Sequence, residues 1–177
     1  MGIGNTTAAS AIAAVLTGAP VEAVTGSGTG IDESTWQRKV AVIRRALAVN
    51  QPDPRDGLDV LAKVGGFEIG GLVGVILAGA AHRIPVVLDG FIAGAAALIA
   101  QALTPQVSPF LLASHCSAEP GHRAVLASLG LVPYLHLGLR LGEGTGAALA
   151  FSLIRAALAI YTEMATFKSA GVSGRAV

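Results

Sequence analysis

Apolar residues recur along most of the chain with the spacing of helices and strands that share one core. The pattern predicts helices over Thr7–Leu16, Glu33–Ala48, Gly57–Val64, Glu68–Ala81, Phe91–Leu103, Glu119–Leu129 and Thr145–Met164. In the helix that Asp32 caps, the residues expected to face the core are Trp36, Val40, Ile43 and Leu47.

Three short apolar runs between these helices predict strands: Ile84–Leu88, Phe110–Ala113 and Tyr134–Leu139. Strands that alternate with helices are usually joined by parallel βαβ connections. We therefore predict an α/β fold, a three-layer α/β/α Rossmann-like domain with a mainly parallel sheet. This single domain is expected over residues 1–168, with a flexible tail over residues 169–177.

Two glycine-rich turns lie near the start of the chain. Gly2–Asn5 leads directly into the first helix, and Gly28–Gly30 belongs to a second turn. Backbone N–H groups at a helix start or in a glycine-rich turn can bind an anion, although an ordinary capped helix explains the first turn as well. Lys39, on the next helix, could meet such an anion or simply be solvated.

A third glycine-rich turn, Arg140–Gly146, precedes the last predicted helix and contains one carboxylate, Glu143. Acidic residues occupy only 11 of 177 positions, so a glutamate among glycines suggests a chemical role. Complementing the helix macrodipole is the alternative. Asp89 follows the first predicted strand, at the sheet edge where α/β proteins bind ligands, but it could equally cap the next helix.

Composition narrows the class of protein. Hydrophobic residues make up 53% of the chain, yet the uncharged stretches Ile69–Ala81 and Gly90–Ser114 are too short or too interrupted for the roughly 20 apolar residues of a membrane span. A net charge of +1 argues against nucleic acid as a partner. The single cysteine, Cys116, suits the cytoplasm. The spacing of the four histidines matches no common metal motif, so no metal site is predicted.

Five segments, in order, resemble the nicotinate-nucleotide:dimethylbenzimidazole phosphoribosyltransferase family of cobalamin biosynthesis. They are Met1–Ser10, Gly26–Gly30 with the following Lys39, Leu88–Gly90, Ser114–His122 and Arg140–Gly146. The resemblance covers essentially the whole chain. In the family a Gly-Glu pair and a long N-terminal half precede the first motif, so the chain resembles the C-terminal half of such an enzyme.

The resemblance implies transfer of the 5-phosphoribosyl group from nicotinate mononucleotide to 5,6-dimethylbenzimidazole, which gives α-ribazole 5′-phosphate and nicotinate. It also implies a homodimer that needs no metal or organic cofactor. Glu143 matches the family's general base, and an apolar, glycine-lined setting is expected to raise its pKa. The implied substrate-binding residues are Gly2, Ile3, Gly4, Asn5, Gly28, Thr29, Gly30, Lys39, Asp89, Ser117, Arg140, Leu141 and Gly142.

Most of the aromatic-base pocket lies in the family's N-terminal half, which the resemblance does not include. The alternative function is therefore a non-catalytic nucleotide-binding fragment that needs a complementary chain. Exposed apolar surface, seen as poor solubility of the chain alone, would favour this alternative.

Overall fold

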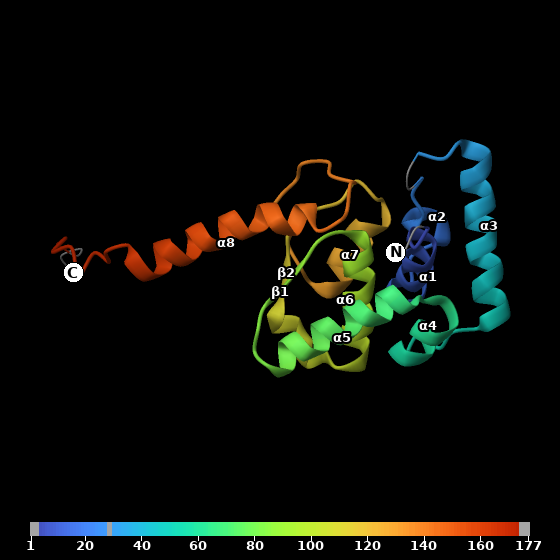
Figure 1. Ribbon diagram of the computed structural model, residues 1–177, viewed down its shortest axis with the longest axis horizontal. Coiled ribbons are helices and arrows are strands. Elements are labelled where there is room, and N and C mark those ends of the chain that lie inside the picture. The colour runs from blue at the N-terminus through green and yellow to red at the C-terminus, as the bar shows by residue number, and fades with distance from the viewer. Residues whose placement is uncertain (1–3, 28–29, 174–177) are drawn as a thin grey trace.

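The computed structural model describes residues 4–27 and 30–173. Helices dominate this part of the chain (Figure 1). They are α1 Thr6–Thr17, α2 Val21–Val24, α3 Glu33–Asn50, α4 Gly57–Val64, α5 Phe67–Ala81, α6 Phe91–Leu103, the 3₁₀ helix η1 Pro105–Phe110, α7 Gly121–Leu129 and α8 Thr145–Glu163. Every predicted helix is present with small shifts in its ends, whereas the short helices α2 and η1 were not predicted.

The sheet consists of two parallel strands, β1 (Val86–Leu88) and β2 (Leu111–Ala113), paired from Val86 with Leu111 to Leu88 with Ala113. Helix α6 and η1 connect them, so the predicted βαβ connection is present. Helices α5, α6 and α8 all pack against β1. The predicted α/β class with a parallel sheet is therefore confirmed, although the sheet is small.

The predicted third strand, Tyr134–Leu139, is not a regular strand. The segment runs parallel to the chain after β2 and makes one isolated bridge, between His115 and Leu135. Gly138, with a φ of 64°, interrupts the extended backbone that a strand requires. The segment still bonds to its neighbour, because the N–H groups of Cys116 and Ala118 donate to the carbonyls of Leu135 and Leu139, at 2.9 Å each.

Helix α6 forms the centre of the core. Phe91 and all residues from Gly94 to Ala100 are buried, and helices α1, α4, α5 and α7 surround them. Most of these positions are alanine or glycine, which lets neighbouring helices approach closely. At Gly94, for example, a Cβ atom would lie 2.8 Å from Cγ1 of Val125 on α7.

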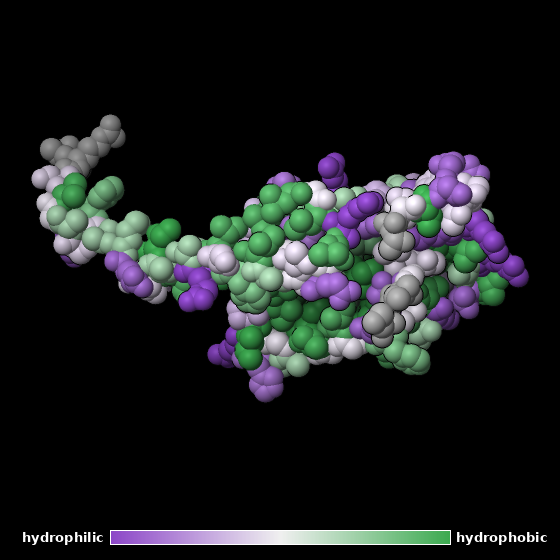
Figure 2. All heavy atoms as spheres, turned by 45° about the horizontal axis from the view of Figure 1, so that its top comes forward, coloured by the Kyte–Doolittle hydropathy of each residue, from purple (hydrophilic) through white to green (hydrophobic). Residues whose placement is uncertain are grey.

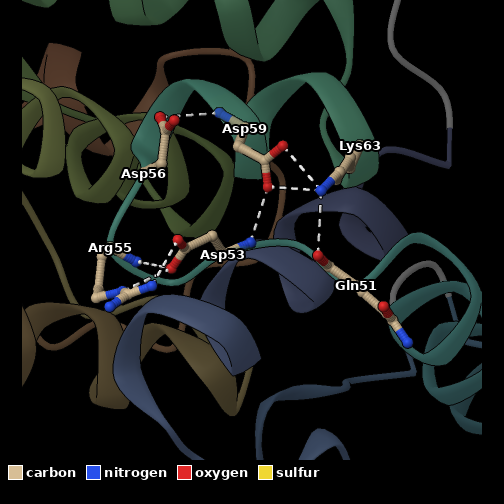
Figure 3. A network of polar contacts seen from close by, with 6 residues as sticks. All are labelled: Gln51, Asp53, Arg55, Asp56, Asp59 and Lys63. Atoms are coloured by element: carbon tan, nitrogen blue, oxygen red, sulfur yellow. Dashed lines mark hydrogen bonds and ion pairs between the residues drawn. The ribbon is translucent and has the colours of Figure 1, made fainter.

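A polar network fixes the loop between α3 and α4 (Figure 3). The Asp59 carboxylate accepts hydrogen bonds from the Asp53 N–H at 2.8 Å and from Lys63 Nζ at 2.9 Å. Lys63 Nζ also donates to the Gln51 carbonyl at 3.1 Å, and Asp56 caps α4 through the N–H groups of its first turn. The bond from Asp53, followed by that from Lys63, lowers the pKa of Asp59. The charged groups of this network pair with one another. The network therefore accounts for the conformation of the loop and does not indicate a chemical site.

Helix α8 extends away from the rest of the molecule (Figure 1). Only Gly146 and Ala150 are buried along it, and hydrophobic side chains remain on its surface (Figure 2). Among the described residues it is the one helix long and apolar enough to cross a membrane, with a hydropathy of 1.4, although Arg155 lies in its middle. An apolar helix that packs on a protein partner has the same composition. The sequence pattern predicted this helix, but not its possible length for a membrane span.

Candidate active site

Two polar segments meet where β1 and β2 end. Asp89 follows β1 and Ser114 follows β2. The Ser114 hydroxyl donates to the main-chain carbonyl of Asp89 at 2.8 Å, and the Ser114 N–H donates to the Leu88 carbonyl at 3.1 Å. Asp89 therefore lies at the sheet edge predicted for it, and Ser114 meets it there.

Glu143 occupies a turn of three residues in the left-handed region, with φ values of 73° at Gly142, 55° at Glu143 and 76° at Gly144. Glycine adopts this region freely, but for another residue it costs about 1–2 kcal/mol. The Glu143 side chain is exposed. The apolar setting predicted for it is therefore wrong for this structure, because the strained turn lies on the surface and no described residue covers it.

The carboxylate of Asp89 binds the backbone of this turn and the first turn of α8. Its Oδ2 accepts from the Gly144 N–H at 3.2 Å, and its Oδ1 accepts from the N–H groups of Gly146 at 2.8 Å and Ala147 at 3.2 Å. The alternative that Asp89 caps the helix after it is wrong, since α6 has no side-chain cap. Asp89 instead caps α8, more than 50 residues further along the chain.

His115 lies beneath the start of α8. Its ring is buried and so close to Gly146 that a Cβ atom at position 146 would overlap it. His115 Nδ1 lies 3.1 Å from the Ser114 hydroxyl. Since that hydroxyl donates to the Asp89 carbonyl, it accepts from His115 Nδ1–H. Glycine at position 146 is therefore required by a contact that no local pattern indicates.

Ser117 belongs to a buried turn that leads into α7. Its N–H donates to His122 Nδ1 at 2.9 Å, and its hydroxyl accepts from the Glu119 N–H at 3.2 Å. Burial, together with the nearby His115, lowers the pKa of His122 to about 4, and the Asp89 carboxylate opposes this shift. His122 is therefore neutral at physiological pH, as its role as an acceptor through Nδ1 requires.

Lys39 joins the first helix to the second glycine-rich turn. Its Nζ donates to the Thr6 hydroxyl at 2.9 Å and to the Gly26 carbonyl at 3.1 Å. Burial of the ammonium lowers the pKa of Lys39, and the charge of Glu119 opposes this shift. The solvated lysine that was the alternative is therefore not observed. Thr6 was not among the predicted site residues, so its contact with Lys39 is new.

Glu119 was not among the predicted site residues. A Cβ atom at Gly26 would overlap its carboxylate, and Glu119 Oε2 is buried without a hydrogen-bond partner among the described residues. Its position in the Ser114–His122 segment was the available signal. Since its N–H bonds to Ser117, Glu119 connects the Lys39 cluster with the turn after β2.

The other predicted residues are placed as follows. Gly4, with a φ of 86°, and Asn5 form the turn before α1, and Gly30, with a φ of 102°, ends the second turn. Arg140, Leu141 and Gly142 precede Glu143 in its turn, and all three are exposed. Gly2, Ile3, Gly28 and Thr29 lie outside the described residues.

An open hollow of about 480 Å³ lies beside the second glycine-rich turn, between Gly26, Trp36 and Pro120. Its volume is within the usual range for small-molecule sites, roughly 300–1,000 Å³. Asp32 and Glu33 also line it, so its outer wall is unfavourable for a phosphate.

Across residues 4–27 and 30–173, no three His, Cys, Asp or Glu side chains come together as a metal site would require.

Known proteins resemble the chain over nearly its whole length. A family model described as phosphoribosyltransferase matches residues 1–172. The nicotinate-nucleotide–dimethylbenzimidazole phosphoribosyltransferase of Desulforudis audaxviator (strain MP104C) is 69% identical over 173 residues, which are 98% of this chain and 49% of that protein. The protein of the same name from Roseiflexus sp. (strain RS-1) is 64% identical over 175 residues, covering 99% of this chain and 50% of its own.

The solved structures agree with these relatives. The crystal structure of CobT from Thermus thermophilus superposes with a TM-score of 0.91 at 50% sequence identity, covering 98% of this chain and 51% of that chain. The chain thus spans about half the length of the relatives that it matches. Since the family model covers 172 of the 177 residues, the chain belongs to the phosphoribosyltransferase family that includes the nicotinate-nucleotide–dimethylbenzimidazole phosphoribosyltransferases.

Proposed function

We propose that the chain carries the nucleotide end and the general base of an enzyme that moves the 5-phosphoribosyl group from nicotinate mononucleotide to 5,6-dimethylbenzimidazole. In this reaction the bond from the ribose anomeric carbon to the nicotinate nitrogen breaks, and a bond to a benzimidazole nitrogen forms. The products are α-ribazole 5′-phosphate and nicotinate. Family membership over residues 1–172 is the observation that carries the proposal.

Glu143 is the proposed general base. The acceptor must lose the proton of one ring nitrogen as its other nitrogen bonds to carbon, and an exposed carboxylate can receive that proton. General base catalysis of this kind contributes about 10²–10⁴-fold in rate. Arg140, Leu141 and Gly142, which precede Glu143 in the same turn, are proposed to contact the substrates.

The proposed phosphate site is formed by Lys39 and the backbone of the two N-terminal glycine-rich turns. An ammonium carries three N–H donors, and two of those on Lys39 are used by Thr6 and Gly26. The remaining donor can bind a phosphate oxygen, and the phosphate would offset the cost of burying the charge. The start of α1 adds the positive end of its dipole. Gly2–Asn5 and Gly28–Gly30 are the proposed backbone donors, and Ser117 contributes from the neighbouring turn.

We also propose a cytoplasmic homodimer. The exposed apolar side chains of α8 support a further partner, since such a surface favours burial against protein. The free thiol of Cys116 is consistent with a reducing compartment. A second copy of this chain is the proposed partner. No binding to nucleic acid or to a membrane is proposed.

Turnover assays test the proposal. The purified chain is incubated with nicotinate mononucleotide and 5,6-dimethylbenzimidazole, and α-ribazole 5′-phosphate is measured by mass spectrometry. The wild-type chain is expected to form product, and Glu143→Gln is expected to reduce the rate at least about a hundred-fold. Nucleotide binding without product in the wild-type chain would instead support the non-catalytic nucleotide-binding fragment.

A further inference from the structure

The turn that carries Glu143 needs a contact from outside its own segment. Gly142, Glu143 and Gly144 all have positive φ values, and Glu143 is exposed. Helix α8 begins immediately afterwards, and its own N-cap residue, Gly144, supplies no side-chain cap. Without another contact, the backbone N–H groups at this helix start would have to be satisfied by water alone.

Asp89 provides that contact from the end of β1. Its two carboxylate oxygens accept from the N–H groups of Gly144, Gly146 and Ala147, at 2.8–3.2 Å. A negative charge at this end of α8 also interacts favourably with the helix dipole. One side chain therefore satisfies three donors that flank Glu143 on its C-terminal side.

The position of Asp89 is itself fixed by the end of β2. The Ser114 hydroxyl holds the main-chain carbonyl of Asp89 at 2.8 Å, and His115 is bonded to the same hydroxyl. The His115 ring also packs directly against Gly146. The start of α8 is thus held at two points by the ends of two paired strands.

We propose that Asp89 is a positioning residue that acts through Glu143 and holds the turn in the conformation in which this glutamate serves as the base. The inference rests on the proposed function of Glu143. It differs from the substrate-binding role predicted for Asp89, because both carboxylate oxygens are engaged with the protein backbone. A direct substrate contact would have to compete with these bonds.

The test compares Asp89→Ala and Asp89→Asn with the wild-type chain. Asp56→Ala is the matched control, since Asp56 likewise accepts from two backbone N–H groups at a helix start, those of Leu58 at 3.0 Å and Asp59 at 3.1 Å, but caps α4. Amide hydrogen exchange at Gly144, Gly146 and Ala147 is measured by NMR. Turnover is measured in parallel as kcat and as KM for nicotinate mononucleotide.

In Asp89→Ala, exchange at Gly146 and Ala147 is expected to accelerate about tenfold or more, and kcat to fall about 10- to 100-fold while the nucleotide KM changes less than about threefold. Asp89→Asn keeps one oxygen acceptor, so smaller changes in the same direction are expected even if Asp89→Ala folds poorly. Asp56→Ala should leave the three amides and kcat unchanged.

Unchanged exchange at the three amides in a folded Asp89→Ala chain would overturn the proposal. A raised nucleotide KM with unchanged kcat would also overturn it and assign Asp89 to substrate binding. If the wild-type chain shows no turnover, the proposed function fails separately. The exchange rates then decide alone whether Asp89 holds the turn.

Discussion

At the residue scale, His122 shows how burial sets the chemistry of a side chain. The ring is 1% exposed, its Nδ1 accepts from the Ser117 N–H, and its pKa is lowered to about 4. In the unfolded chain the pKa of this histidine is near 6.5. Between pH 4 and pH 6.5 the unfolded chain therefore binds more protons than the folded chain. Stability from neutral His122 is thus fully present above about pH 6.5 and is lost as the pH falls toward 4.

His122→Asn removes this titration and keeps an acceptor for the Ser117 N–H. Between pH 7 and pH 4, the free energy of unfolding is expected to fall in the wild-type chain by up to about 3 kcal/mol more than in the variant. Urea denaturation at several pH values measures the difference. His136→Asn, at an exposed position, is the control and should follow the wild type. Parallel pH curves for the wild type and His122→Asn would contradict the prediction.

The backbone at Glu143 gives a second prediction at this scale. Glu143→Gly and Glu143→Ala both remove the carboxylate, but only glycine adopts a φ of 55° without strain. Glu143→Gly is therefore expected to be more stable than Glu143→Ala by about 1 kcal/mol, as measured by thermal denaturation. Equal stabilities would show that the turn relaxes out of the left-handed conformation. Both variants should lack turnover.

Single residues also show which parts of the site the sequence could predict. Glu143 lies in a glycine-rich segment and Lys39 on the helix after another, and the family resemblance identified both. The cap that Asp89 provides to α8 could not be predicted, because capping patterns are local and this contact spans more than 50 residues. Glu119 lies in a segment that the family resemblance identified, but its proximity to Gly26 exists only in the folded chain.

At the scale of elements, the predicted helices are present, whereas the predicted third strand is not a regular strand. Helix periodicity is visible within one segment, so the positions of α3, α4 and α6 were correct to within a few residues. A strand depends on a partner, and the apolar run Tyr134–Leu139 has the composition of a strand but bends at Gly138. Only two parallel strands are therefore regular in the described residues.

Two helical glycines should respond in opposite ways to alanine. A Cβ atom at Gly146 would overlap the His115 ring, so Gly146→Ala is expected to destabilise the chain by about 1–3 kcal/mol. Gly71, exposed on α5, has no neighbour within 4 Å of the added atom, so Gly71→Ala is expected to stabilise it by about 0.5–1 kcal/mol. Chemical denaturation measures both changes. A stabilising Gly146→Ala would contradict the packing described here.

At the scale of the whole molecule, α8 is the feature that supports the proposed homodimer. Leu158 is 61% exposed and Phe151 is 53% exposed on a helix that extends from the body. The proposed homodimer predicts that sedimentation velocity detects a dimer and that Leu158→Glu weakens it. Val49→Glu, at a position 71% exposed near the end of α3, is the control. A monomeric wild-type chain would contradict the homodimer.

The central claim is that this chain contains a working nucleotide site beside a separate general base. Thermal unfolding with and without nicotinate mononucleotide tests it most directly, with nicotinate, which lacks the phosphate, as the control ligand. At 100 times its dissociation constant, the nucleotide should stabilise the wild-type chain and Glu143→Gln by about 2.7 kcal/mol each. Lys39→Ala should lose most of this stabilisation. A folded wild-type chain that nicotinate mononucleotide does not stabilise would contradict the account.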